Sequence, residues 1–260
     1  MTDVPDRPAA ARPLTERVAL VTGAGSGLGR AIALDLAAGG AHVLVGDIDV
    51  EGAKTTAQHV EALVEELGGG SAEAVELDVT DRAGVDAVVG RAAREHGARF
   101  DILVNNAGTD RGDDVVDVDD ERWHRVFAVN VHGPMYLSRA FVRHLQALET
   151  PPAGDVVCIV SISALTVGAG AAAYNSSKAA MHKLAEVMQT ESRERGWPAR
   201  VAIVDPAAMN TPMMDQWGLP QERMMDPAIV AGLVRTAVTL PPEVVLQNVV
   251  VTLRNEYYPR

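Results

Sequence analysis

Short apolar, β-branched runs alternate with helical segments from residue 17 onward, and this alternation restricts the fold more than any other feature. Strands are predicted at Arg17–Thr22, His42–Gly46, Ala72–Leu77, Phe100–Asn105, Asp155–Ser161, Arg200–Val204 and Val245–Thr252. Helices are predicted at Leu28–Ala38, Val50–Leu67, Arg82–Glu95, Asp119–Glu149, Ala172–Arg195 and Pro227–Thr239. Such a βα repeat predicts a doubly wound, Rossmann-type α/β fold, with helices on both faces of a parallel sheet of about seven strands.

The chain shows no composition shift, linker or repeat that would mark a second domain. Its 260 residues, 47% of them apolar, are enough for one sizeable core. We therefore expect a single domain over residues 15–260. Residues 1–14, which contain three prolines, are predicted to be a disordered tail.

The net charge and the cysteine content indicate which binding partners and which cellular compartment the sequence suits. The formal net charge of −12 argues against nucleic acid or an anionic membrane surface as a partner. No uninterrupted apolar run approaches the length of a membrane span. Cys158 is the only cysteine and lies in an apolar run, which suits a core residue in a reducing cytoplasm. No metal site is predicted.

A glycine-rich turn follows the first strand and opens the first helix. Gly23, Gly27 and Gly29 let the backbone approach a pyrophosphate, whose charge the helix N-terminus favours. Ser26 and Leu28 lie within the turn, and Leu28 occupies the place of the third glycine in G-x-G-x-x-G. A tight turn made only for close helix packing is the other interpretation.

Asp47 ends the second strand, 18 residues after Gly29. This is near the spacing expected for a carboxylate that binds the adenosine ribose hydroxyls of a dinucleotide. A carboxylate there would repel a 2′-phosphate, and Ser26 places no cation in the turn to attract one. The pattern favours NAD over NADP.

Tyr174 and Lys178 are four residues apart in a predicted helix, so their side chains share one face. A nearby ammonium favours the phenolate and lowers the pKa of a tyrosine toward the working range, which makes it a general acid and base. Ser161, 13 positions earlier, lies at a strand end where its hydroxyl could hold a carbonyl oxygen. Ser163 is the second candidate there and could line the pocket.

Together these motifs resemble the short-chain dehydrogenase/reductase family, over roughly Leu14 to Asn255. The matching segments follow the family's order: Thr22-Gly23-x-x-x-Gly27-x-Gly29, Asp78-Val79, Asn105-Asn106-Ala107-Gly108, Asn130, Ser161 and Tyr174-x-x-x-Lys178. The set is far more specific than any one of its members.

The resemblance implies roles for these residues. Tyr174 would be the proton donor and acceptor, and Lys178 would lower its pKa while bonding the nicotinamide ribose. Ser161 would polarise the substrate oxygen, and Asn130 would hold a water in a proton relay. The implied cofactor-binding residues are Gly23, Ser26, Gly27, Leu28, Gly29, Asp47, Asp78, Val79, Asn106, Ala107, Gly108, Tyr174, Lys178, Pro206, Met209 and Thr211.

The segment after the sixth strand departs from the family pattern. Ala207 replaces the glycine that usually follows proline, and Asp205 precedes that proline either as a turn-starting residue or as a substrate ligand. Residues 212–226 are predicted to be a substrate lid. Trp217 and the methionines of this segment could equally pack against a neighbouring subunit.

Several carboxylates follow strands at the predicted ligand edge of the sheet: Asp110, Asp113 and Asp114, then Asp205 and Asp215. They would favour a polar or cationic substrate, unless they simply face solvent. The candidate substrate residues are Ser163, Asp110 and Trp217.

The combined pattern predicts a cytoplasmic, NAD-dependent oxidoreductase acting on a secondary alcohol or ketone. The family resemblance implies a homodimer or homotetramer. Two alternatives stay open: an epimerase that oxidises and re-reduces one carbon with bound cofactor, and a non-catalytic cofactor-binding protein, since a fold does not fix function.

Overall fold

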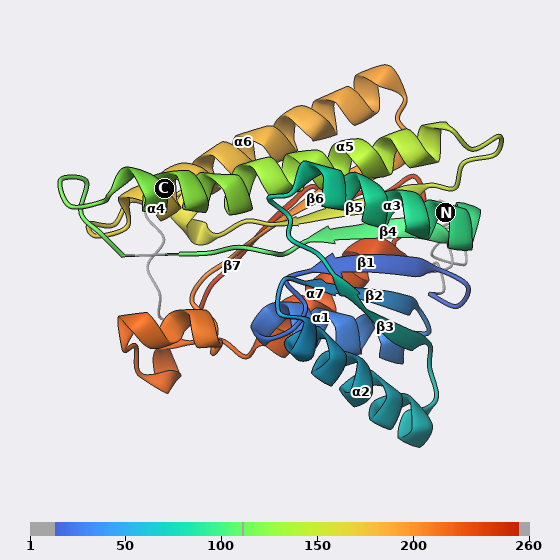
Figure 1. Ribbon diagram of the computed structural model, residues 1–260, viewed down its shortest axis with the longest axis horizontal. Coiled ribbons are helices and arrows are strands. Elements are labelled where there is room, and N and C mark those ends of the chain that lie inside the picture. Colours follow the sequence, from blue (N-terminus) through green and yellow to red (C-terminus); the bar gives the residue numbers. More distant parts are fainter. Residues whose placement is uncertain (1–13, 111, 255–260) are drawn as a thin grey trace, which may run out of the picture.

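The computed structural model describes residues 14–110 and 112–254, which form one parallel sheet of seven strands with helices on both faces (Figure 1). The strand order is β3-β2-β1-β4-β5-β6-β7. The chain therefore winds outward in one direction from β1 and in the other from β4. The predicted doubly wound fold is confirmed.

The seven strands lie close to their predicted positions. They are β1 (Val18–Thr22), β2 (His42–Asp47), β3 (Ser71–Glu76), β4 (Phe100–Asn105), β5 (Gly154–Ile159), β6 (Ala199–Pro206) and β7 (Asn248–Val251). β6 runs further than predicted, through Asp205 to Pro206, because its last residues still pair with β7. β7 is shorter than predicted and is a half-exposed edge strand.

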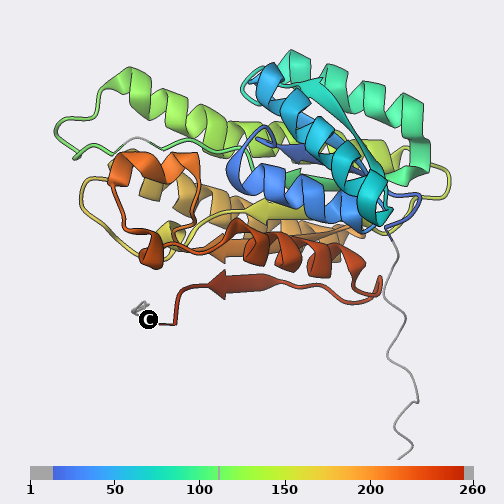
Figure 2. The same ribbon diagram turned by 90° about the horizontal axis from the view of Figure 1, so that it is seen from below.

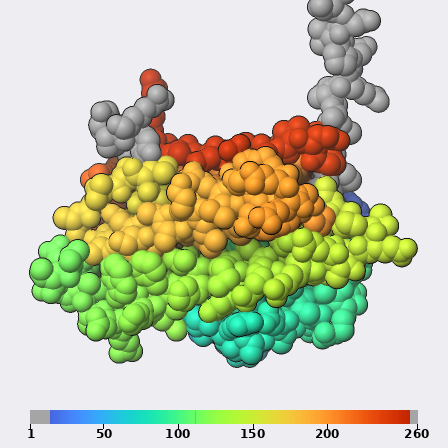
Figure 3. All heavy atoms as spheres, turned by 90° about the horizontal axis from the view of Figure 1, so that it is seen from above, coloured from blue at the N-terminus to red at the C-terminus, as the bar shows by residue number. Residues whose placement is uncertain are grey.

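The helices form two layers (Figure 1). One face carries α1 (Gly27–Ala38), α2 (Val50–Leu67) and α7 (Pro227–Thr239), and the other carries α3 (Arg82–His96), α4 (Asp120–Phe127), α5 (Gly133–Gln146) and α6 (Ala172–Arg195). Figure 3 shows α6 and α5 as adjoining bands across the second face, with α3 beyond α5. No described helix is both long and apolar enough to cross a membrane.

The central strands are buried over their whole length, as expected where helices cover both faces of a parallel sheet. Two apolar cores result, one under α1 and α7 and one under α3, α5 and α6. Cys158 lies in the second core, where burial raises the pKa of its thiol to about 12. This confirms its interpretation as a core residue. Leu14, assigned to the tail, is also buried, and the rest of that segment lies outside the described residues.

The long helix predicted at Asp119–Glu149 is divided. α4 and α5 are joined by a π-helical segment, Ala128–His132. Pro134 lacks the N–H that would bond the carbonyl of Asn130 in a regular helix, so the hydrogen-bond ladder changes there. Asn130 lies within this segment.

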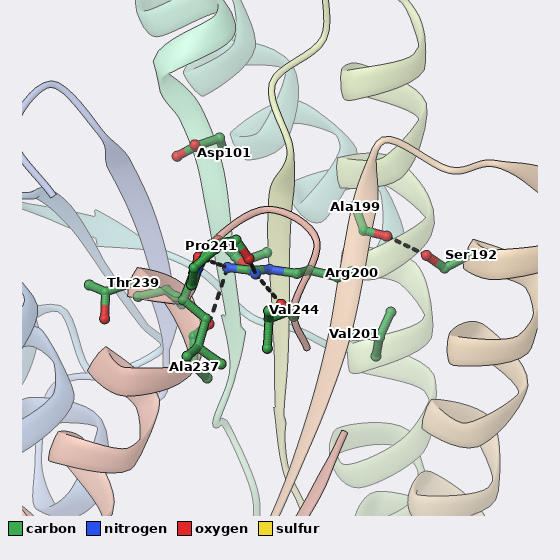
Figure 4. Close-up of polar contacts among 12 residues, drawn as sticks. Asp101, Ser192, Ala199, Arg200, Val201, Ala237, Thr239, Pro241 and Val244 are labelled. Atoms are coloured by element: carbon green, nitrogen blue, oxygen red, sulfur yellow. Dashed lines mark hydrogen bonds and ion pairs between the residues drawn. The ribbon is translucent and has the colours of Figure 1, made fainter. Parts of the chain in front are cut away.

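A buried ion network closes the amino-terminal edge of the sheet. Arg17 donates to Asp101 at 2.8 Å and to Asp155 at 2.6 Å, and Asp155 also accepts from Arg200 at 2.6 Å. The Arg17 guanidinium also donates to the carbonyl of Val238 in α7. The Arg200 guanidinium donates to carbonyls of α7 and of the turn after it, including those of Ala237 and Pro241 (Figure 4). The opposite, carboxyl-terminal edge is left for the functional site.

The predicted lid folds as two short 3-10 helices, Pro212–Trp217 and Gln221–Arg223. This segment lies beside the loop that follows β4, as Figure 2 shows. Met225, at the end of the segment, is buried and pairs with Met209, which anchors the lid next to β6.

Candidate active site

A cleft of about 660 Å³ opens at the carboxyl-terminal edge of the sheet, where β1 and β4 diverge. Almost all of the predicted site residues line it: Gly23, Ser26, Gly27, Leu28, Gly29, Asp47, Asp78, Val79, Asn106, Ala107, Gly108, Asp110, Ser161, Ser163, Tyr174, Lys178, Pro206, Met209, Thr211 and Trp217. Asn130 alone lies behind the wall. In an open α/β sheet, ligands are expected to bind at the carboxyl ends of the strands, at the point where the strand order reverses, and this cleft lies there.

The glycine turn is built for close approach of a ligand. Gly23 and Gly27 have φ values of 63° and 49°, which L side chains rarely adopt. A Cβ on Gly29 would overlap the carbonyl oxygen of Gly23 and lie 2.6 Å from Asn106 Nδ2. The first turn of α1 has no acidic residue, and the Ser26 side chain does not cap it. The N-terminal N–H groups of α1 therefore suit a phosphate, and the turn fits the diphosphate of a dinucleotide.

Thr22 and Asn106 fasten this turn to the loop after β4. Thr22 Oγ1 accepts hydrogen bonds from the N–H groups of Asn106 and Ala107 at 3.1 and 3.0 Å. Asn106 Nδ2 donates to the carbonyls of Thr22 and Gly23 at 2.9 and 3.1 Å. The two loops that form the floor of the cleft are thus held together by side chains.

Asp47 lies at the far end of the cleft from Tyr174. Its Oδ2 accepts from Gly25 N at 2.8 Å, and its Oδ1 accepts from Asp49 N at 2.9 Å. Arg30, the cation nearest the turn, is bonded to the Gly25 carbonyl and to Thr56, outside the residues that line the cleft. The carboxylate is therefore fixed in orientation, and no lysine or arginine of residues 14–110 and 112–254 forms an ion pair with it.

Ser161 and Tyr174 both line the cleft. A hydrogen bond from Ser161 lowers the pKa of Tyr174, although burial outweighs it. Ser161 Oγ accepts from the N–H of Ser163 at 3.1 Å, which leaves the Ser161 hydroxyl hydrogen to donate. Ser163 lies beside this pair on the cleft wall.

The pKa values of Tyr174 and Lys178 differ from the expected pattern. Burial raises the pKa of Tyr174 to about 12, and the Asp110 charge also raises it. Burial lowers the pKa of Lys178 to about 8. Lys178 Nζ donates to the carbonyl of Ile159 at 3.3 Å and lies 5.6 Å from the centre of the Tyr174 ring. Burial therefore outweighs any lowering of the phenol pKa here, and the lowering expected from Lys178 stays a prediction.

Asn130 holds three elements together. Its Oδ1 accepts from Thr109 N at 2.8 Å, and its Nδ2 donates to the Thr109 carbonyl at 2.9 Å and to Ser177 Oγ at 3.0 Å. The side chain thereby joins the π-helical segment to the loop after β4 and to α6. Its water-holding role stays a prediction.

Asp110 and Trp217 meet across the cleft mouth. Trp217 Nε1 donates to Asp110 Oδ2 at 3.1 Å, and the indole ring packs on Gly112. The lid therefore contacts the loop after β4 within the same chain. Of the candidate mouth carboxylates, only Asp110 is both buried and part of the cleft wall, whereas Asp113 pairs with Arg122.

Asp205 corrects the sequence interpretation, because it neither starts a turn nor borders the mouth. It is fully buried within β6, and its Oδ1 lies 3.2 Å from His182 Nδ1. Sequence analysis missed His182. Its place four residues after Lys178, on the same face of α6, was the available signal.

No group of three or more His, Cys, Asp or Glu side chains within residues 14–110 and 112–254 is arranged to hold a metal ion.

A Rossmann-type cleft with a Ser-Tyr-Lys wall defines an oxidoreductase of the dinucleotide-binding class. Comparison with known proteins agrees, since the model of the short chain dehydrogenase family matches residues 17–222. The chain belongs to the short-chain dehydrogenase family, whose members bind a nicotinamide cofactor.

Relatives and solved structures are similar over nearly their whole length. An uncharacterized oxidoreductase of Staphylococcus aureus is 28% identical, over 92% of this chain and 97% of its own. An alcohol dehydrogenase from the archaeon Thermococcus sibiricus, complexed with 5-hydroxy-NADP, has a TM-score of 0.81 and 26% identity, over 93% of this chain and 99% of its own. A metagenomic short-chain oxidoreductase in complex with NADP has a TM-score of 0.77 and 29% identity, over 92% and 97%.

Gly29→Ala tests the glycine turn. The added Cβ has no room beside Gly23 and Asn106. We expect NADH or NADPH affinity, measured by fluorescence titration, to fall about tenfold or more, the equivalent of about 1.4 kcal/mol. Gly232→Ala is the matched control, because a Cβ there meets nothing within 4 Å. Equal affinity in the two variants would contradict the role of the glycine turn in dinucleotide binding.

Proposed function

We propose that the protein is an NAD(H)-dependent oxidoreductase that interconverts a small polar secondary alcohol and its ketone. The observation that carries this proposal is the position of the Ser161 hydroxyl and the Tyr174 phenol on the same cleft wall, next to the Lys178 ammonium. Two hydroxyl groups at one point can hold a single carbonyl oxygen. A cytoplasmic homodimer or homotetramer stays part of the prediction.

The bound nicotinamide supplies hydride transfer to or from the carbon that bears this oxygen. In the reductive direction, Ser161 donates a hydrogen bond to the carbonyl oxygen while Tyr174 donates its proton to it. The raised pKa of Tyr174 keeps the phenol protonated, so it is ready to act as the acid.

Lys178 serves the same step through its charge. When Tyr174 has given up its proton, the adjacent ammonium stabilises the phenolate that remains. In the oxidative direction the same groups act in reverse, and Tyr174 accepts the alcohol proton. Asn130 fixes the loop and the helix around the pair by its bonds to Thr109 and Ser177.

Tyr174→Phe removes the phenol hydroxyl from the cleft wall and should leave the fold intact. We expect turnover to fall by about 10²- to 10⁴-fold, the usual effect of losing a general acid–base. Tyr136→Phe, on α5 and outside the cleft, should keep wild-type turnover. The assay follows NADH absorbance with a panel of ketones and alcohols. Retained activity in Tyr174→Phe would refute the mechanism.

The preference for NAD is proposed from Asp47. Its oriented carboxylate suits the two ribose hydroxyls and repels a 2′-phosphate. The two similar structures cited above contain 5-hydroxy-NADP and NADP, so the preference of this protein between NAD and NADP needs to be measured directly.

Asp47→Asn tests this preference while keeping an acceptor for the N–H of Gly25. We expect weaker NAD binding and a smaller ratio of kcat/KM with NAD to that with NADP, by about tenfold, the effect of about 1.4 kcal/mol. Asp49→Asn removes an exposed carboxylate two residues away and should leave the ratio unchanged. A wild-type protein that prefers NADP would show that Asp47 has another role.

The substrate class is proposed from Asp110. This carboxylate is 8% exposed and lines the cleft. Its charge raises the pKa of both Tyr174 and Lys178, so it acts electrostatically on the proposed reacting groups. A hydroxyl or amino group on the substrate would complement it. A steroid or fatty chain would not.

Amino alcohols should therefore have higher kcat/KM than neutral alcohols of similar size at low salt, and the advantage should shrink at high salt. Asp110→Asn should abolish most of the difference. Asp114→Asn, on the exposed part of the same loop, should preserve it. Equal kcat/KM values for both alcohol classes at every salt concentration would rule the idea out.

A further inference from the structure

α6 carries four ionisable side chains at intervals of four residues: Tyr174, Lys178, His182 and Glu186. Side chains at this spacing share one face of a helix. Tyr174 and Lys178 line the cleft, His182 is buried, and the Glu186 side chain is 39% exposed. The row thus runs from the reacting groups to the surface.

Asp205 faces the middle of this row from β6 and is fully buried. Its Oδ1 lies 3.2 Å from His182 Nδ1, whereas its Oδ2 has no hydrogen-bond partner among the described residues. The groups that face it are Lys178 and His182 from α6, the thiol of Cys158 from β5, and the N–H of Ser161. Its neighbour in β7 is the apolar Val250.

His182 holds this carboxylate in place. Burial raises the pKa of Asp205, while His182, the Ser161 N–H and Lys178 lower it. The other ring nitrogen of His182 lies 3.6 Å from Glu186 Oε1. With its proton on Nδ1, the His182 ring donates a hydrogen bond to the buried Asp205 carboxylate.

Lys178 needs such a carboxylate. The residue is 5% exposed, and burial lowers its pKa to about 8, whereas the charges of Asp110 and Asp205 raise it. A neutral amine would give no electrostatic help to the Tyr174 phenolate. The charge state of Lys178 therefore depends on the anions around it.

We propose that Asp205, oriented by His182, is a positioning residue that acts through Lys178: its charge keeps the ammonium protonated and so sets the upper end of the pH range in which Tyr174 exchanges its proton. This inference rests on the proposed function for its catalytic consequence. The charge relation between Asp205 and Lys178 can be measured without any turnover.

The direction of the effect follows from the sign of the charges. A nearby anion favours the charged form of a lysine and raises its pKa. Asp205→Asn keeps the shape and a hydrogen-bonding group but removes the charge, so Lys178 should lose its proton at a lower pH. The loss of turnover as pH rises should then begin about one pH unit earlier than in the wild type. At low pH, where the ammonium is charged in both proteins, the rates should converge.

The lysine content makes a direct measurement practical. Lys54, Lys178 and Lys183 are the only lysines of the chain. In protein labelled with ¹³C-lysine, only three side-chain signals would be followed by NMR against pH, and Lys178→Arg assigns the buried one. We expect the Lys178 signal of Asp205→Asn to titrate about one pH unit below that of the wild type. The Lys54 and Lys183 signals should not move.

Two further variants separate charge from structure. His182→Leu removes the donor to Asp205, which favours the neutral carboxyl and should lower the Lys178 titration as Asp205→Asn does. His182→Asn keeps a donor near the position of Nδ1 and should restore most of the wild-type value. Glu186→Gln removes a carboxylate from the exposed end of the same row and should leave the Lys178 titration unchanged.

An unchanged Lys178 titration in Asp205→Asn would overturn the inference, as would a loss of turnover that is uniform across all pH values. Wild-type protein that turns over no alcohol or ketone would instead refute the proposed function. The Lys178 titration would still decide whether Asp205 controls the ammonium.

Discussion

The hydrogen bonds between Thr22 and Asn106 are the contacts on which the position of the cleft depends. They join the loops after β1 and β4, the two neighbouring strands from which the chain winds in opposite directions. The backbone groups at this divergence are partly or fully buried and need partners, which these two side chains supply. These hydrogen bonds hold the floor of the cleft in place where a ligand would lie closest to the backbone. They also support the glycine turn, whose glycines have no side chains to pack.

Burial, more than the mutual attraction of Tyr174 and Lys178, controls the charge of the reacting groups. Desolvation favours the neutral form of both, raising the pKa of the phenol and lowering that of the amine. The nearby carboxylates Asp110 and Asp205 act in the opposite direction on the amine, because they raise the pKa of Lys178.

The sequence was most informative where the signal is local. Helices Val50–Leu67, Ala172–Arg195 and Pro227–Thr239 were predicted with their observed bounds, and the glycine turn followed from a strand, a run of glycines and an apolar helix. The π-helical segment before Pro134 was missed because helical periodicity continues across it. The contact between Asp205 and His182 could not be predicted, since it joins a strand to a helix through packing, and neither residue has a distinctive spacing to the other.

The guanidinium groups of Arg17 and Arg200 have a consequence for biosynthesis. Arg17 leaves the ribosome before its acceptors Asp101, Asp155 and the carbonyl of Val238, which follow in that order. A nascent chain that stops short of Val238 would bury the Arg17 guanidinium without that acceptor, and would lack most of the carbonyls that Arg200 requires. The amino-terminal edge of the sheet is thus completed only once α7 has been synthesised.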